Sequence, residues 1–534
     1  MKHKVLIMAI AATALSSPLF AADNAELQHE IQRLQEQTKA LQNQLGRLQK
    51  QLVVQPVNKS ATKSVAVAKS TTQKSVKQVE SKPPLPVAGN TFHTSSLSVH
   101  TLEGHPESIG FYPTALIADN RVVTYIAGTP VVTSPYSGDR PAFDGSDYIV
   151  NISSINRDIR LMQQRRRLYR AYERIGYPFP HTPIIALSGK AEPVGALNHP
   201  YFGRSTADLT LGASELDAAA ILNDKVEAFM SIAYDEGPPI LGGQRVANSA
   251  FSLNLGFVNI GNLDQSPFYF TAGQLYVPFG RYSSAMVSSP LTLRLTRTKA
   301  RPFILGYKSQ EDSGPFAALY AFKSDTSLGH TGIGGVNLGY VIKWGELSGE
   351  LGASYISSIT DSRGMQVTGS QPGTTFGGFS SFTNGSEFVR KVPGLGAHTS
   401  ISVDRYNFTA EWVGASSHFR TQDLSFNGRG AKPQAAQIEG GVTFMVFSKP
   451  ASLALGYQWS KDTLALHLPE HRISSVFNIS IWKDTVESLE YRHDIDFKRG
   501  RYANGAAPAG LTNLNTYGTG RSSDALLAQI GVYF

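Results

Sequence analysis

The chain of 534 residues contains no cysteine. This absence excludes disulfide bonds, thiolate metal sites and cysteine nucleophiles. It also suits a protein exported to an oxidising compartment, where an unpaired thiol would form unwanted disulfides.

After the N-terminus the chain also lacks any run of about eighteen apolar residues, so no membrane-spanning helix is predicted. A transmembrane β-barrel remains compatible with this composition, because only alternate strand residues face lipid. At the N-terminus, Lys2 and Lys4 precede the apolar stretch Val5 to Leu15 and small residues up to Ala22. This pattern predicts a secretory signal peptide over residues 1–21, with cleavage near Ala21 or Ala22.

Signatures of catalysis and cofactor binding are also scarce. The thirteen histidines show no metal-ligand spacing, and Gly332 to Gly335 lies in a predicted strand rather than a phosphate-binding loop. His398 and Ser400 share one strand face, as in a lipid-hydrolysing barrel, but no partner acid accompanies them. We therefore expect no enzyme, no catalytic residue, no metal, no cofactor and no nucleic-acid partner.

In the last nine residues, from Leu526 to Phe534, every second side chain is apolar, while Gln529 and Gly531 lie on the other face. Such a strand has one apolar face, and it carries none of the charges or prolines that protect a free sheet edge. The sequence therefore predicts a strand paired on both edges whose apolar side meets lipid. The apolar face consists of Leu526, Ala528, Ile530, Val532 and Phe534.

Sixteen segments with a period of two follow one another from about Ile184 to the C-terminus. Tight turns and longer connections alternate between them, which is typical of outer-membrane barrels with short periplasmic turns and long external loops. The predicted fold is an all-β transmembrane barrel of about sixteen antiparallel strands over residues 184–534, in the outer membrane of a Gram-negative bacterium. The tight turns are predicted at 223–224, 261–264, 309–313, 344–345, 404–405, 448–450 and 483–484.

The N-terminal region is expected in the periplasm. Leucines and isoleucine with 4,3 spacing predict a coiled-coil helix over residues 22–54, which would make a homo-oligomer through residues 26–52. An amphipathic helix packed on the barrel rim is the alternative. Residues 55–90 hold six lysines against one acid, Glu80, and predict a flexible tether.

Residues 91–183 form a pre-barrel segment whose fold the pattern leaves open, except for an arginine-rich helix between Ile155 and Ile175. Seven arginines against Asp158 and Glu173 give this stretch a local charge of +5. Alternation places several glutamates on the lumen side of the barrel wall, which are either simply solvated or partners of this helix as a plug. The candidate lumen and plug residues are Arg165, Arg166, Arg167, Glu350, Glu411, Glu439 and Glu490, with Glu227 as a further inward acid.

The predicted external loops carry an excess of arginine. Guanidinium groups bind carboxylates and phosphates, so these loops would attract either anionic solutes or the phosphates of lipopolysaccharide. A separate loop, 369–386, holds three phenylalanines among Gly and Ser and is the predicted inward constriction. The candidate ligand-attracting residues are Arg281, Arg294, Arg297, Arg420, Arg429, Arg499 and Arg501.

The stretch from Gly273 to Gly280, Gly-Gln-Leu-Tyr-Val-Pro-Phe-Gly, resembles a strand-end motif of phosphate-selective-type porins and of the LbtU family of siderophore porins. The order of signal peptide, heptads, Lys-rich tether, Asn151 to Arg167 segment and barrel resembles the LbtU layout along nearly the whole chain. This resemblance implies uptake of a ferric siderophore of the polycarboxylate kind, without the plug domain and energy-coupling box of classical receptors. It assigns no binding residue.

Three functions are therefore considered. The first is a siderophore channel, with a ferric siderophore, outer-membrane lipid and lipopolysaccharide as its partners. The second is a general or phosphate-type anion-selective porin. The third is a structural or adhesive barrel, which the heptads and the tether would favour.

Overall fold

The computed structural model describes residues 122–126, 129–133, 156–163, 165–166, 183–236, 249–324, 332–345, 347–362, 364–365, 390–421, 423–482, 485–503 and 517–534. The predicted signal peptide, heptad helix, tether and 369–386 loop lie outside these residues, as does most of the pre-barrel segment. Within the described part of the chain, no helix is both long and apolar enough to cross a membrane.

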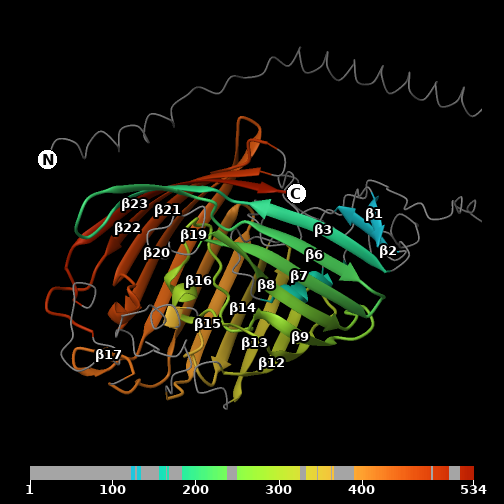
Figure 1. Cartoon of the computed structure of the whole chain (residues 1–534), viewed down its shortest axis with the longest axis horizontal. Helices are drawn as coiled ribbons and strands as arrows, with labels where there is room; N and C mark the ends of the chain where they lie inside the picture. Colours follow the sequence, from blue (N-terminus) through green and yellow to red (C-terminus); the bar gives the residue numbers. More distant parts are fainter. Residues whose placement is uncertain are drawn as a thin grey trace, which may run out of the picture. The chain divides into compact units, whose positions relative to one another are not determined.

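The described strands form a closed 16-strand antiparallel β-barrel (Figure 1). Most passes through the wall are single strands, but three passes are each interrupted by a short irregularity: β3 with β4, β5 with β6, and β10 with β11. The wall consists of β3 (Ile184–Ala191), β4 (Val194–His199), β5 (Thr206–Thr210), β6 (Glu215–Ile221), β7 (Val226–Glu236), β8 (Ser249–Ile260), β9 (Phe268–Tyr276), β10 (Lys299–Ala300), β11 (Phe303–Lys308), β12 (Gly314–Lys323), β13 (Gly332–Trp344), β14 (Leu347–Ile356), β15 (Gly394–Val403), β16 (Tyr406–Ala415), β19 (Gln434–Val446), β20 (Lys449–Lys461), β21 (His471–Ile479), β22 (Thr485–Ile495) and β23 (Ser522–Tyr533). The predicted sixteen strands and the alternation of tight turns with longer connections are confirmed.

Smaller elements lie outside the wall. The hairpin of β1 (Val122–Ile126) and β2 (Thr129–Thr133) precedes it, and β2 pairs in parallel with β3 through Val131 and Ile185. This hairpin covers a part of β3 that β23 does not reach, since β23 pairs with β3 only at Lys190 and Ala191. Connections between strands contain α4 (Leu291–Thr296), the hairpin β17 (Ser425–Phe426) and β18 (Arg429–Gly430), and the 3-10 helix η2 (Leu464–Leu466).

The C-terminal residue closes the barrel. Phe534 donates its backbone N–H to the carbonyl of Gly189 at 2.9 Å and accepts the N–H of Gly189 at 2.5 Å. Its ring lies against Gly189, where a Cβ atom would approach the ring to 2.9 Å. The first and last strands are thus joined up to the final residue, as the apolar C-terminal strand predicts.

Deleting Phe534 should weaken this closure by removing both backbone hydrogen bonds, each of which contributes about 1 kcal/mol. We expect protein refolded in detergent to lose its heat-modifiable gel band at a lower temperature than the wild type. Phe534→Leu, which keeps the backbone, serves as the control. Equal transition temperatures for the deletion and the wild type would contradict this role of the C-terminus.

The outer surface carries the apolar residues. Leu526, Ile530, Val532 and Phe534 are all exposed, as the alternation in the last strand predicts. Aromatic side chains mark the tight-turn end, where Trp344 is 81% and Phe447 is 95% exposed. Side chains this apolar and this exposed require lipid rather than water around the wall, and aromatic girdles are typical of the membrane interfaces.

The predicted alternation fails in one strand. In β8, the alternation of the sequence puts Phe251, Leu253, Leu255 and Phe257 on one apolar face and so predicts that all four meet lipid, but Leu255 and Phe257 are 0% and 3% exposed. Ser231 of β7 pairs with Leu255, and the next residue, Ile232, pairs with Leu253, so that Asn254 is an unpaired bulge residue. A bulge shifts the alternation by one residue, which turns Leu255 and Phe257 inward and Val258 and Ile260 outward.

Candidate functional site

The connection from β9 to β10, residues 277–298, lies inside the barrel instead of projecting as an external loop. Its anchor is Glu411 of β16, whose carboxylate accepts the backbone N–H groups of Arg281 at 2.6 Å and Tyr282 at 3.0 Å. The hydroxyl of Thr292 donates to the same carboxylate at 2.9 Å. An inward glutamate therefore supplies the acceptors that this part of the backbone lacks.

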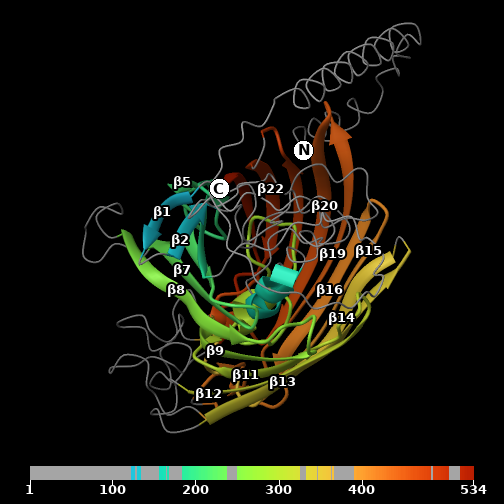
Figure 2. The same ribbon diagram turned by 90° about the vertical axis from the view of Figure 1, so that its right-hand side faces the viewer.

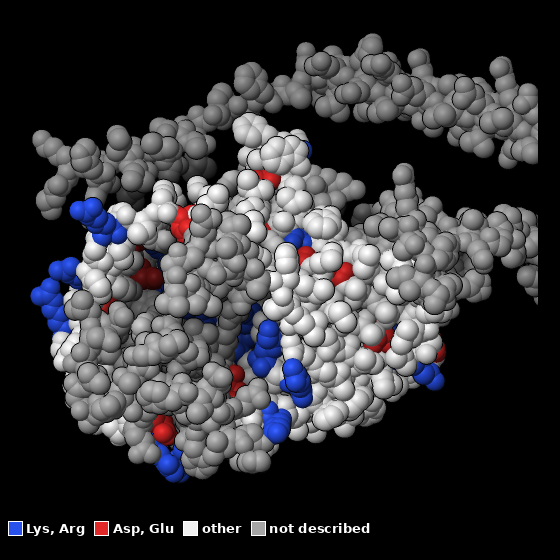
Figure 3. Space-filling view, in the orientation of Figure 1, with Lys and Arg blue, Asp and Glu red and all other residues white. Residues whose placement is uncertain are grey.

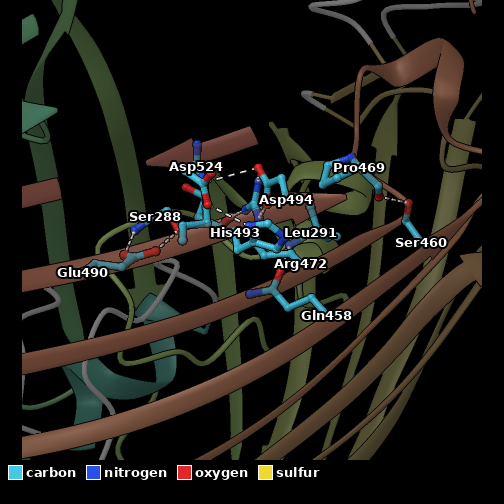
Figure 4. A network of polar contacts seen from close by, with 12 residues as sticks. Ser288, Leu291, Gln458, Ser460, Pro469, Arg472, Glu490, His493, Asp494 and Asp524 are labelled. Atoms are coloured by element: carbon cyan, nitrogen blue, oxygen red, sulfur yellow. Dashed lines mark hydrogen bonds and ion pairs between the residues drawn. The ribbon is translucent and has the colours of Figure 1, made fainter. Parts of the chain in front are cut away.

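Two further glutamates hold the same segment. Glu439 of β19 accepts the backbone N–H of Ala285 at 2.6 Å and the hydroxyl of Ser284 at 2.8 Å. Glu490 of β22 accepts the backbone N–H of Ser288 at 2.7 Å (Figure 4). The segment is thus tied to three different strands, which fixes its course across the lumen.

The local sequence favours this compact course. Gly280 has φ of +73°, and a Cβ atom there would lie 2.5 Å from the ring of Tyr282. The Tyr282 hydroxyl hydrogen-bonds to Thr296 of α4 at 2.8 Å. Leu291 and Leu295 of α4 are completely buried, so that apolar packing and hydrogen bonds act together to hold the segment.

A cluster of three arginines lies beside this segment, and Figure 4 shows one of them, Arg472, next to Asp494. Arg472 of β21 binds Asp494 of β22 through two contacts of 2.7 and 3.1 Å, and donates to the carbonyl of Ser289 at 3.1 Å. Arg492 approaches the same carboxylate at 3.3 Å. Arg294 of α4 is exposed, and the charged groups of Arg472 and Arg492 lie near it.

The arginine-rich helix, described over residues 157–163 and 165–166, lies within the ring of strands, where Figure 2 shows it in teal. Arg165 forms an ion pair with Glu227 at 3.2 Å and donates to the carbonyl of Gly261 at 2.6 Å. Arg166 binds Asp264 at 2.9 Å and also the carbonyl of Gln310. These partners lie at or near tight turns, so this end of the helix contacts the tight-turn half of the lumen.

The other end of the helix contacts β6 and β7. Arg157 forms an ion pair with Asp217 at 3.2 Å, and its guanidinium group lies 4.8 Å from the ring centre of Phe229. Asp158 accepts the hydroxyl of Thr271 at 3.1 Å. Ile159 and Met162 pack with Leu263 and Tyr269, so the helix binds the wall with both its charged and its apolar side chains.

Three of the predicted ligand-attracting residues do not lie in an external loop. Arg281, Arg294 and Arg297 belong to the inward segment, because its backbone donors pair with lumen glutamates. Arg281 forms an ion pair with Glu350 at 3.4 Å, and Arg297 lies 4.5 Å from the ring centre of Tyr276. Only Arg294 of the three is exposed.

The remaining predicted arginines lie in long connections. Arg420, Arg499 and Arg501 are exposed, while Arg429 is 55% exposed and forms an ion pair with Asp462 at 3.4 Å. In Figure 3, the visible Lys and Arg side chains (blue) lie mainly at the left edge and near the centre of the view, whereas the wall on the right is mostly uncharged. Among the described residues, no hydrogen bond or ion pair joins these four arginines to Arg294, Arg472 or Arg492.

The predicted lumen glutamates have specific partners. Glu227 contacts the helix, whereas Glu411, Glu439 and Glu490 hold the inward segment. Glu350 binds His398 at 3.2 Å as well as Arg281. His398 and Ser400 are therefore buried with a lumen carboxylate and do not face lipid, and Arg167 lies outside the described residues.

Sequence analysis missed Arg472, Asp494 and Ser288. Arg472 and Asp494 occupy inward positions of their strands, so applying the alternation to every charged residue of β21 and β22 would have indicated them. Ser288 could not be identified, because its role is to donate to Glu490 and a sequence pattern does not reveal such a contact. No group of three or more His, Cys, Asp or Glu side chains in the described part of the chain could hold a metal ion.

Comparisons with known proteins identify relatives over the full length. No family model matches the chain. It is 62% identical to a UPF0422 protein of Legionella pneumophila (strain Philadelphia 1) over all of both chains. It is 35% identical to a UPF0422 protein of Coxiella burnetii, over 75% of this chain and 83% of that protein.

Among solved structures, the outer membrane channel DcaP of Acinetobacter baumannii aligns with a TM-score of 0.42 at 12% identity, over 67% of this chain and 99% of that chain. An anion-selective porin from Comamonas acidovorans aligns with a TM-score of 0.41 at 13% identity, over 66% of this chain and 100% of that chain. Similarities of this size assign no solute. The family follows from the sequence relatives: the chain belongs to the UPF0422 proteins.

Proposed function

We propose that this protein is an outer-membrane channel that takes up a bulky anionic solute, a ferric siderophore of the polycarboxylate kind. The apolar outer surface and the exposed aromatic residues at the tight turns support a position in a lipid bilayer. A barrel of sixteen strands encloses an aqueous lumen unless something fills it.

The inward segment 277–298 is the observation that carries the proposal. Its three glutamate anchors place a fixed constriction inside the barrel, where an open pore would have none. A fixed constriction selects solutes by size and charge, which a structural or adhesive barrel does not need.

The choice of a siderophore rests on the resemblance of the sequence layout to the LbtU family. A general or phosphate-type anion-selective porin is the second candidate, and the exposed Arg294 in the lumen favours it equally. The two differ in what they transport, because a general porin would pass small anions and show no preference for an iron complex.

Iron uptake tests the proposal. A deletion strain should accumulate less radiolabelled iron from its own ferric siderophore, and the wild-type gene should restore uptake. In a control, the same strains receive iron as the ferric citrate complex or as the free ion, and the difference in uptake between the strains shows whether transport requires the siderophore. Equal uptake by the deletion and parent strains, together with small conductance steps for chloride in planar bilayers, would instead identify a general anion porin.

Cleavage of intact cells tests the orientation. If the tight turns face the periplasm, trypsin added outside should cut within the long connection that carries Lys498, Arg499 and Arg501, but not after Lys483 in a tight turn. Cells with a permeabilised outer membrane provide the control in which both sides are accessible. Cleavage after Lys483 in intact cells would reverse the proposed orientation.

A further inference from the structure

The arginine cluster beside the inward segment contains more positive than negative charge. Arg472 and Arg492 both contact Asp494, and Arg294 lies on α4 close to them. Glu490 is also near Arg492, but it accepts hydrogen bonds from the backbone and hydroxyl of Ser288. The three arginines outnumber these two carboxylates, and the neighbouring Asp496 accepts hydrogen bonds from the backbone N–H and the hydroxyl of Thr519.

The three arginines differ in their freedom to bind a solute. Arg472 is 1% exposed and is held by Asp494 and the carbonyl of Ser289, so that it supports the cluster. The side chain of Arg492 is 22% exposed. Arg294 is exposed, and within the described residues no carboxylate forms an ion pair with it.

Arg294 and the rest of the arginine cluster lie toward one end of the lumen, the end with the long connections. Arg472 is the second residue of β21, at the end that joins the connection 462–470, and Asp494 is the last residue but one of β22, at the end that joins 496–521. Leu291, at the start of α4, donates its backbone N–H to Gln458 near the matching end of β20 at 2.8 Å, so α4 and its Arg294 lie toward the long-loop end. A solute entering from that end would meet Arg294 before it passes the segment.

We propose that Arg294 and Arg492, supported by Arg472, form a binding site for carboxylate or phosphate groups of the transported solute. This inference rests on the proposed channel function and adds the site of recognition to it. Guanidinium groups suit these ligands, because their planar N–H donors match two oxygens of one oxyanion. Two or more neighbouring arginines favour solutes with several such groups over monovalent anions such as acetate.

The test measures single-channel currents of the full-length protein in planar bilayers. Citrate, inorganic phosphate and acetate are added in turn on the long-loop side, and the concentration that halves the current is determined for each. We expect citrate to block at the lowest concentration and acetate at the highest. Arg294→Gln and Arg492→Gln should each raise the half-blocking citrate concentration by about tenfold, as expected for the loss of one charge-assisted contact.

Two further variants separate recognition from general electrostatics. Arg294→Lys keeps the charge but not the planar donors, so chloride selectivity should remain while citrate block weakens. Arg204→Gln removes one exposed charge from the connection between β4 and β5 and should leave citrate block unchanged. Folding of each variant is verified by its heat-modifiable gel band.

The possible results distinguish this inference from the channel proposal. A folded wild type that forms no conducting channel would overturn the channel function itself. A conducting wild type that citrate and phosphate do not block, or equal effects of Arg204→Gln and Arg294→Gln, would overturn only the site. Stronger block by phosphate than by citrate would support the site and assign it to phosphate-bearing solutes.

Discussion

Replacing Glu411 and Glu439 together by alanine should raise the single-channel conductance by roughly threefold, because a sixteen-strand barrel without a constriction leaves an open aqueous channel. These two carboxylates accept the backbone N–H groups of Arg281, Tyr282 and Ala285. Without them, these donors have no acceptor in the lumen wall, and the segment gains more by moving into water. Cells that produce the variant should also become more sensitive to large hydrophilic antibiotics.

Two controls make this result specific to the segment. Glu311→Ala removes one carboxylate from a tight turn and should leave the conductance unchanged. Glu411→Gln keeps one acceptor oxygen and should give a smaller increase than the alanine variant. Unchanged conductance in a folded Glu411→Ala and Glu439→Ala double variant would show that the segment does not constrict the channel.

Arg165→Glu should displace the arginine-rich helix from the barrel wall. The substitution places a second carboxylate beside Glu227, which is completely buried, and breaking a buried ion pair costs about 3–5 kcal/mol. We expect a larger conductance and greater sensitivity to antibiotics, because the helix occupies part of the lumen. Arg166→Glu should have a smaller effect, since its partner Asp264 is 39% exposed.

A charge exchange tests whether the ion pair is the cause. Combining Arg165→Glu with Glu227→Arg restores opposite charges at the two positions, so the double variant should recover most of the wild-type conductance. Wild-type conductance of Arg165→Glu alone would mean that the helix does not restrict the lumen. A double variant as leaky as Arg165→Glu would locate the effect elsewhere than in this pair.

The barrel could be predicted from the sequence because lipid imposes a simple rule on each strand. Alternation of apolar and polar residues located the sixteen strands, and the apolar face of the last strand agrees with its exposure in the structure. The rule failed in β8, because the unpaired Asn254 shifts the alternation and no residue type marks that shift. Bulges depend on the partner strand, which a single segment does not specify.

The inward segment could not be identified from its arginines, because an external loop and a lumen segment can have the same charge. The composition of the segment could have indicated its location, because residues 277–298 contain no Asp or Glu. The inward glutamates on β16, β19 and β22 need hydrogen-bond donors, and a segment without acids can supply them. Those glutamates were placed correctly on the lumen side, but the sequence could not show that backbone N–H groups rather than the helix would bind them. Pairing a backbone donor with a distant carboxylate depends on the course of the chain in three dimensions.

The bulge at Asn254 affects how ionic strength acts on the protein. By turning Leu255 and Phe257 inward, it gives the barrel wall an apolar area that belongs to the same buried cluster as Leu161 of the helix. Added salt screens ion pairs, especially the more exposed ones, but salts that are excluded from protein surfaces strengthen apolar contacts. The two effects oppose each other where the helix meets the wall, so the helix should stay bound over a wide range of salt concentrations. The outer membrane of the cell should then stay closed to small solutes in both dilute and concentrated surroundings.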